Sequence, residues 1–337
     1  MGKTGVRGTF AALVAAVLCG CGSEPDFVTV DGTMLGTTLH VVADVKGVSR
    51  QRLYAAVMEL DREAKASMSI YDSTSLVSRL NRNETDSTDA LFQKMYAMAL
   101  QVNRKTEGAF DITVGPLVNA WGFGFKQNSF PDSARIDTLR QFVGMDLLTL
   151  TEGKLQKKYP EITLDASSIA KGLGVDLVAE YFERKGLNDY MVEIGGEVRA
   201  KGQSSKKRPW RIGIDRPEED VTARNRRLQM IAGLSQGALA TSGNYRNFYV
   251  HDGKKYAHTI NPKTGYPVQT EVLSASVYAP TCMEADAYAT AFMVLGLQKA
   301  RQIVLADPEL EGAFIYLEEG KMKNWISPGF EKLIVEK

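Results

Sequence analysis

The order of the predicted secondary structure is the feature that most restricts how this chain can fold. Strand-like segments dominate after residue 190, where β-branched and aromatic residues stand between turn signals. These segments are residues 190–194, 210–214, 228–234, 248–251 and 272–278. Helices and strands do not alternate regularly along the chain, as they would in a doubly wound α/β fold. The sequence therefore predicts an α+β fold, with mixed or antiparallel sheets and packed helices.

Helical periodicity and capping residues predict five helices. They start near Ser49, Asp89, Asp132, Ser168 and Thr281. Glycines follow several of the expected ends, and Gly186 and Gly296 are suited to close the last two helices. Alternating apolar residues predict two more strands, at 39–45 and 161–165.

The first residues are typical of an export signal. Lys3 and Arg7 precede a short apolar run that is too short to span a bilayer. The run ends in Leu18-Cys19-Gly20-Cys21, which resembles a bacterial lipobox with Cys21 as the lipidated residue. The alternative is a plain signal peptide that is cut near Gly20 or Gly22.

The lipobox interpretation divides the chain into three parts. Residues 1–20 are the lipoprotein signal peptide, 21–27 a lipidated tether, and 28–337 the folded domain, in which we expect two intimately packed lobes. Acyl chains would hold the protein to a membrane surface. We therefore expect an exported, membrane-anchored lipoprotein that faces the periplasm.

Composition excludes some classes of function. The 337-residue chain has a formal net charge of +1, so nothing suggests nucleic acid as a partner. Cys282 is the one cysteine left in the body of the domain, which rules out an internal disulfide framework and favours a buried thiol over a nucleophile. The chain contains no dinucleotide fingerprint, no Walker phosphate loop and no nucleophile elbow.

Several segments combine glycine and polar residues with apolar ones in an unusual way. They are residues 34–38, 67–72, 108–116, 121–124, 164–172, 193–197, 240–245, 258–265 and 285–291. In this order the set resembles the FAD:protein FMN transferase family, also called ApbE proteins, from about Val28 onward. The resemblance implies a T-fold-related architecture and an enzyme that uses Mg²⁺ to split FAD. Such an enzyme releases AMP and attaches FMN to a threonine or serine of an acceptor flavoprotein subunit.

Asp286 and Thr290 are the candidate metal ligands. They stand four residues apart on a predicted helix, so that their oxygens share one face. Spacing alone leaves open an exposed aspartate and a threonine bonded to its own backbone. The resemblance implies that both side chains hold Mg²⁺, together with the backbone carbonyl of Ser168.

Other residues match the family positions that contact FAD. Asp165 and Lys171 flank a predicted helix start, where amides and a lysine favour anions, although an ordinary helix-start carboxylate and a solvated lysine fit equally well. The remaining matches are Met34, Tyr71, Ala109, Phe110, Asp111 and Ile260. Without the resemblance, core packing would explain Met34 and Phe110.

His258 is the candidate general base, because imidazole titrates near neutral pH and could accept the proton of an attacking hydroxyl. It could equally be a structural histidine that orients the turn at Pro262. Two rival functions remain open from the sequence. One is a Mg²⁺-dependent FAD pyrophosphatase, and the other is a non-catalytic FAD-binding lipoprotein.

Overall fold

The computed structural model describes residues 26–124, 130–218, 227–244, 248–251 and 254–336. The predicted signal peptide, Cys21 and nearly all of the predicted tether therefore lie outside the described residues. Within the described ranges, none of the helices combines the length and the apolar character that crossing a bilayer requires.

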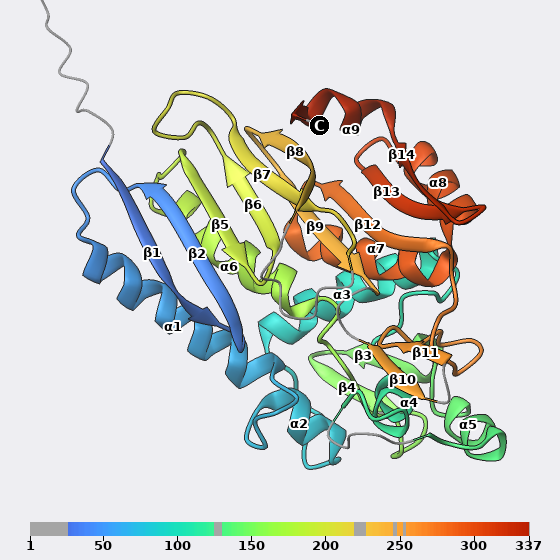
Figure 1. Ribbon diagram of the computed structural model, residues 1–337. Coiled ribbons are helices and arrows are strands. Elements are labelled where there is room, and N and C mark those ends of the chain that lie inside the picture. The colour runs from blue at the N-terminus through green and yellow to red at the C-terminus, as the bar shows by residue number, and fades with distance from the viewer. Residues whose placement is uncertain (1–25, 125–129, 219–226, 245–247, 252–253, 337) are drawn as a thin grey trace, which may run out of the picture.

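An eight-stranded sheet forms the centre of the molecule, with the strand order β1-β2-β5-β6-β9-β12-β13-β14 (Figure 1). Its strands are β1 (Phe27–Met34), β2 (Thr37–Asp44), β5 (Tyr190–Ile194), β6 (Glu197–Lys201), β9 (Ala238–Gly243), β12 (Val272–Ala279), β13 (Glu311–Glu318) and β14 (Lys321–Ile326). Every pair of neighbours is antiparallel. The predicted α+β class with antiparallel sheets is confirmed.

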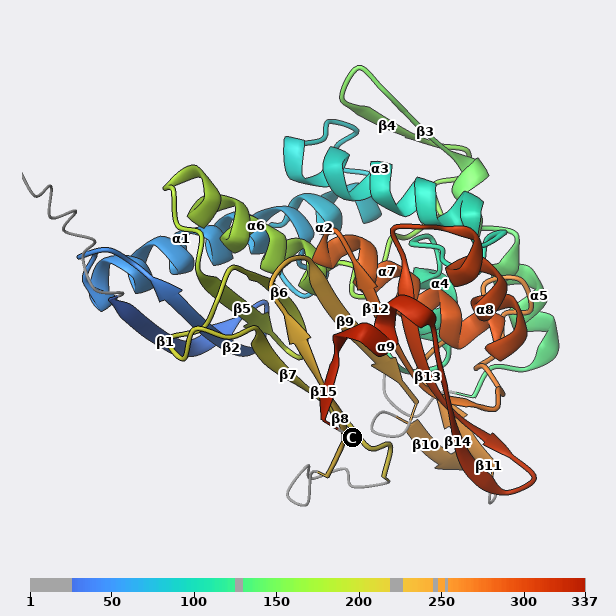
Figure 2. The ribbon, with the colours of Figure 1, turned by 90° about the horizontal axis from the view of Figure 1, so that it is seen from above.

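One face of this sheet is covered by helices, as Figure 2 shows from above. The covering helices are α1 (Arg50–Met68), α6 (Ala170–Arg184), α7 (Cys282–Leu295) and α8 (Leu297–Ala306), and α3 (Ala90–Lys105) packs on the outer side of α1 and α7. Alternate residues of β5, Tyr190, Val192 and Ile194, are buried in the core beneath these helices. This alternation is expected for a strand with one face in the core.

The opposite face of the sheet carries a second, smaller core. A three-stranded sheet of β7 (Trp210–Asp215), β8 (Leu228–Leu234) and β15 (Ile334–Glu336) lies there, together with α9 (Pro328–Leu333). Trp210 and Ile212 of β7 pack with Val198 of β6 and Leu239 of β9. The strands in the middle of the large sheet are therefore covered on both faces.

A third group of short elements stands beside the end of the sheet, at the lower right of Figure 1. It includes α4 (Gly115–Ala120), α5 (Ser133–Arg140), β10 (Phe248–His251) and β11 (Lys254–Ala257). Its own apolar cluster joins Leu117 and Trp121 to Ile136 and Ile260. The hairpin of β3 (Leu148–Thr151) and β4 (Lys154–Lys157) lies apart from this group, beside α3 in Figure 2. Like α2 (Leu76–Asn81) and the 3₁₀ turn η1 (Met145–Leu147), it packs on the large core. The division into two lobes stays a prediction.

The predicted helix starts are confirmed wherever a capping side chain marks them. Ser49, Asp89, Asp132 and Thr281 each accept a hydrogen bond from the backbone N–H three residues further on. Gly296 follows α7 with φ +75°, a conformation that side chains with a Cβ disfavour.

The predicted strand at 161–165 is wrong. Ile162 and Leu164 are buried, which explains the alternating pattern, but the segment pairs with none of the strands in the described ranges. Instead the Asn81 side chain bonds both the N–H and the C=O of Leu164, and the Asp165 N–H donates to the Ile112 carbonyl. The segment is an extended connection held by a side chain, which hydropathy cannot distinguish from a strand.

The contact between α6 and α7 determines where the two helices lie. Asp176 of α6 is buried and accepts hydrogen bonds from the backbone N–H groups of Cys282 and Met283, at 3.0 and 2.8 Å. It also pairs with Arg199 of β6 at 2.8 Å. At Gly172 the backbones approach so closely that an added Cβ would lie 2.7 Å from the Met283 Cα.

We expect Gly172→Ala to lower the free energy of unfolding by about 1–3 kcal/mol, because the new methyl group would meet rigid backbone. Gly174→Ala on the same helix is the matched control. Its Cβ would meet the end of the flexible Leu35 side chain, so its cost should be clearly smaller. Urea unfolding of both variants measures the difference, and equal stabilities would contradict the proposed backbone clash.

Candidate active site

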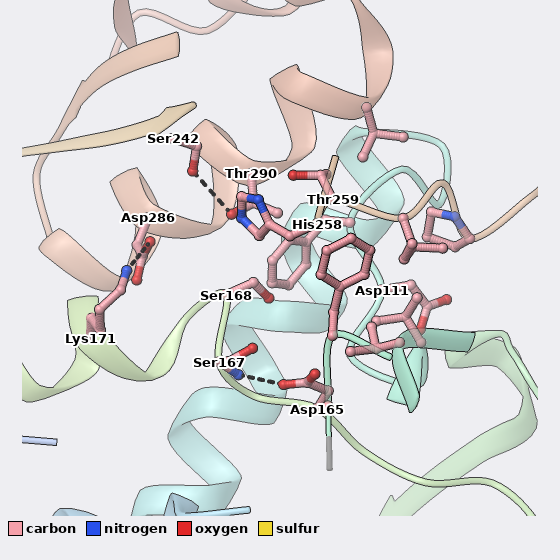
Figure 3. Close-up of a pocket in the computed structure, with 18 of the residues that line it drawn as sticks. Asp111, Asp165, Ser167, Ser168, Lys171, Ser242, His258, Thr259, Asp286 and Thr290 are labelled. Atoms are coloured by element: carbon pink, nitrogen blue, oxygen red, sulfur yellow. Dashed lines mark hydrogen bonds and ion pairs between the residues drawn. The ribbon is translucent and has the colours of Figure 1, made fainter. Parts of the chain in front are cut away.

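A cavity of about 420 Å³ lies at one end of the sheet, where segments from across the chain meet (Figure 3). The connection after α1 contributes to its lining, as do the loop after α3, the start of α6, the ends of β6 and β9, the loop after β11, and α7. Of the twelve site residues predicted within the described ranges, eleven line this cavity. They are Tyr71, Ala109, Phe110, Asp111, Asp165, Ser168, Lys171, His258, Ile260, Asp286 and Thr290.

The predicted metal pair lies on α7. Asp286 is 2% exposed, and Thr290, one turn later, lines the same cavity. Oδ2 of Asp286 accepts the Gly172 N–H at 3.0 Å. The Thr290 hydroxyl lies 3.3 Å from the hydroxyl of Ser242 at the end of β9. The helical spacing has thus brought a carboxylate and a hydroxyl to one wall.

The Ser168 carbonyl lies just outside α6, whose N-cap is Ile169. The Gly172 N–H belongs to the first turn of α6, where backbone donors have no acceptor within their own helix. Here that N–H donates to Asp286, and within the described part of the chain no backbone N–H donates to the Ser168 carbonyl. Such a carbonyl can serve as a ligand without disturbing the helix.

Lys171 stands between two buried carboxylates. Its Nζ lies 2.7 Å from Oε1 of Glu197 and 3.5 Å from Oδ1 of Asp286, and Figure 3 shows the second of these contacts. Burial raises the pKa of Glu197 to about 7, although Lys171 opposes the shift. Burial also raises the pKa of Asp286. Burial alone would lower the pKa of Lys171, but the carboxylates of Asp286 and Glu197 raise it.

Asp111 and Asp165 anchor loops as well as lining the cavity. Asp111 accepts hydrogen bonds from the Thr113 backbone and hydroxyl and from the Met145 N–H. Burial raises its pKa in spite of these bonds. Asp165 accepts the Ser167 N–H at 2.9 Å. Both carboxylates therefore have a structural role, whatever they contact in a ligand.

The cavity also has aromatic and apolar walls. Tyr71 is 73% exposed, whereas Phe110 and Ile260 are buried. Met34 is the predicted site residue that the structure does not bring to the cavity. It is fully buried and packs near Gly174 of α6.

His258 enters the cavity from the loop after β11, and Thr259 follows it in the lining. Its imidazole ring meets the edge of Phe123, with 6.5 Å between ring centroids. Phe123 in turn stacks on Tyr249 of β10, at 4.2 Å between centroids. Aromatic neighbours thus support one side of the histidine, whose ring remains partly exposed to the cavity.

Sequence reasoning gave no role to Glu197, Ser242 or Asp176. Glu197 follows Gly195 and Gly196, which form a turn with positive φ between β5 and β6. A carboxylate directly after such a turn is the one signal in the sequence that could have identified Glu197 as a site residue. Ser242 and Asp176 gave none, because their partners lie 48 and 106 residues away along the chain.

Acidic side chains alone do not form a metal site here. Within the described ranges, no group of three or more His, Cys, Asp or Glu side chains lies close enough together to hold a metal ion. A cation would need Asp286, neutral oxygens and oxygens from a ligand, which is the usual environment of protein-bound Mg²⁺. Of the lining residues that the structure describes, four are carboxylates and one is a lysine: Asp111, Asp165, Glu197, Asp286 and Lys171.

Comparison with known proteins gives consistent results. A family model described as "ApbE family" matches residues 35–314. A curated protein from Haemophilus influenzae named FAD:protein FMN transferase is 39% identical, over 88% of this chain and 89% of that protein. The protein of the same name from Escherichia coli is 32% identical, over 97% of both chains.

Two solved structures share the fold. The flavin transferase ApbE from Vibrio cholerae superposes with a TM-score of 0.83 at 34% identity, covering 91% of this chain and 99% of that one. The flavinyl transferase ApbE from Pseudomonas stutzeri, in its apo form, superposes with a TM-score of 0.81 at 29% identity, covering 91% and 96%.

Proposed function

This chain belongs to the ApbE family, and on that premise we propose that it is an FAD:protein FMN transferase. It takes FAD as its substrate and transfers the FMN part to a threonine or serine hydroxyl of an acceptor flavoprotein subunit, with release of AMP. One observation carries the proposal: a single cavity combines a hydroxyl–carboxylate pair on α7, a lysine, a histidine and aromatic cover.

The walls of the cavity suit the parts of FAD. Flat rings need apolar or aromatic cover with a few polar anchors, and Tyr71, Phe110 and Ile260 supply such cover. The start of α6 suits a pyrophosphate, because backbone N–H groups at a helix N-terminus and a nearby lysine attract anions.

A divalent cation is the part of the proposal that the charges of the cavity support most directly. Among the described lining residues, four carboxyl groups outnumber one ammonium, and in their ionised form they would repel the two negative charges of a pyrophosphate. We propose that Asp286, Thr290 and the Ser168 carbonyl hold Mg²⁺. When bound, this ion neutralises the charge that builds on the pyrophosphate oxygens as AMP leaves.

The chemical step is a displacement at phosphorus. The acceptor hydroxyl oxygen forms a bond to the FMN-side phosphorus, and the bond from that phosphorus to the bridging oxygen breaks. The bridging oxygen leaves with AMP. We assign His258 to accept the hydroxyl proton, because it is the histidine of the described cavity lining. Lys171 and the start of α6 hold the anionic groups in position.

The membrane anchor forms the last part of the proposal. We propose that Cys21 is lipidated and that the enzyme faces the periplasm from a membrane surface. The support is the order of residues 3–21, in which basic residues, a short apolar run and Leu-Cys-Gly-Cys follow one another.

Incubation of the protein with FAD, Mg²⁺ and a candidate acceptor peptide tests the function. We expect flavinylated peptide and AMP. Free FMN with AMP would indicate a pyrophosphatase instead, and unchanged FAD would indicate a binding protein.

In the same assay Asp286→Ala should lose AMP release and transfer together while still binding some FAD. Asp286→Asn should be nearly as impaired, and Thr290→Ala less so, because water can replace a neutral ligand. Unchanged magnesium dependence in Asp286→Ala would place the metal elsewhere.

His258→Ala should lower turnover by roughly a hundredfold, with little change in FAD affinity, if the imidazole accepts the proton. His40→Ala is the control, because this partly exposed histidine pairs with Asp31 and does not line the cavity. Turnover and FAD affinity are measured separately. A loss explained entirely by weaker FAD binding would assign His258 a structural role.

Cys21→Ala should abolish labelling of the exported protein by radioactive palmitate and leave an uncleaved or soluble form. Labelling that persists in this variant would exclude Cys21 as the anchor. Cys19→Ala is the matched control, because Cys19 would be removed with the signal peptide and its loss should leave labelling intact.

A further inference from the structure

Two buried carboxylates share one ammonium group at the proposed metal site. Lys171 Nζ is bonded to Oε1 of Glu197 and lies farther from Oδ1 of Asp286, at 2.7 and 3.5 Å. Glu197 is 4% exposed and lines the cavity, yet its second oxygen, Oε2, has no hydrogen-bond partner among the residues that the structure describes. A buried carboxylate oxygen without a partner is costly, so its retention calls for an explanation.

We propose that Glu197 is a positioning residue, which holds the Lys171 ammonium away from Asp286 so that Oδ1 stays open to a divalent cation. This inference rests on the metal site of the proposed function. Glu197 is not a metal ligand in this scheme. It acts through Lys171.

The hydrogen bonds of Asp286 indicate that Oδ1 is the oxygen that would bind the cation. Oδ2 already accepts the Gly172 N–H at 3.0 Å, at the rigid contact between α6 and α7. Oδ1 is therefore the oxygen left for a cation, and it is also the oxygen nearest to Lys171. An ammonium in direct contact with Oδ1 would compete with the metal for the same lone pairs.

The fold leaves Lys171 room to take either partner. A Cβ at Gly195 would lie 3.3 Å from Lys171 Cδ, so the glycine turn between β5 and β6 makes space for the lysine stem. Its side chain is 32% exposed, whereas those of Glu197 and Asp286 are 5% and 2% exposed. The lysine can therefore move, and the two carboxylates are the fixed points.

Removal of the Glu197 charge would leave Asp286 as the nearest partner of the ammonium. Lys171 would then close on Oδ1, and a cation would have to displace it. With Glu197 present, the ammonium keeps Oε1 as its partner when the metal binds. Oε2 of the same carboxylate is a further acceptor beside an ammonium that carries three donors.

A double-mutant cycle tests this scheme through Mg²⁺ affinity, measured by calorimetry on the full chain without FAD. Glu197→Gln should weaken Mg²⁺ binding by roughly tenfold when Lys171 is present. In the Lys171→Met background, the same substitution should change the affinity by less than about threefold. Glu197→Asp is the second variant. It keeps the charge and shortens the reach, and should show the same dependence on Lys171 even if Glu197→Gln folds poorly.

Glu284→Gln is the matched control, because Glu284 is a largely buried carboxylate on α7 that does not line the cavity. It should leave Mg²⁺ affinity unchanged. Equal losses from the Glu197 substitutions in both backgrounds would overturn the inference, since Glu197 would then act by its own charge or as a ligand. Asp286→Ala distinguishes failure of the proposed metal site from failure of the proposed role of Glu197. If it binds Mg²⁺ as tightly as the wild type, the proposed metal site fails and the inference fails with it. If it loses binding while the cycle shows no coupling, the inference alone fails.

Discussion

The contact of Asp176 with the first turn of α7 is the interaction on which the site depends. Its carboxylate bonds two N–H groups of that helix and pairs with Arg199 of β6, so one buried charge connects α6, α7 and the central sheet. Burial raises the pKa of Asp176, while Arg199 and the two backbone bonds oppose the rise. A buried ion pair is weak as a source of stability but effective in selecting one arrangement of its partners. Here that arrangement brings Gly172 against α7 and places Asp286 within reach of the Gly172 N–H.

The same arrangement sets the electrostatics of the cavity. A helix start and a lysine would by themselves attract phosphate, but the surrounding carboxyl groups oppose this attraction when they are ionised. The proposed function accounts for this balance, because an anion that enters with a cation is repelled less than an anion alone. In the proposed function, a bound divalent ion would change the local charge by two units and so weaken the repulsion of a pyrophosphate. Tyr71 and Ile260 of the lining would supply ring contacts that simpler phosphates cannot make.

The sequence predicted the parts of this structure that are encoded locally. Helix starts at Ser49, Asp89, Asp132 and Thr281 follow from capping chemistry within four residues, and the pairing of Asp286 with Thr290 follows from helical spacing. The strand predicted at 161–165 is wrong, because the side chain of Asn81 makes the backbone hydrogen bonds that a neighbouring strand would otherwise make. Asn81 belongs to a helix far away along the chain. Glu197 at the start of β6 and Ser242 near the end of β9 could not be predicted as site residues, for a similar reason. Their partners, Lys171 and Thr290, are far away along the chain, so that no local sequence pattern shows the two contacts.

The distances along the chain that the site spans bear on how the molecule forms. The β1–β2 hairpin and the capped helices are local structures that can form early. The bonds from α6 to α7 join residues 106 and 114 positions apart, and closing such loops is entropically costly before any contact repays it. A collapsed chain in which α7 has not yet packed against α6 would already contain the hairpin and the helices. It would lack the contact between Asp286 and Gly172. Metal and nucleotide would thus bind only to the completed fold, and their binding would draw the last folding equilibrium toward the native state.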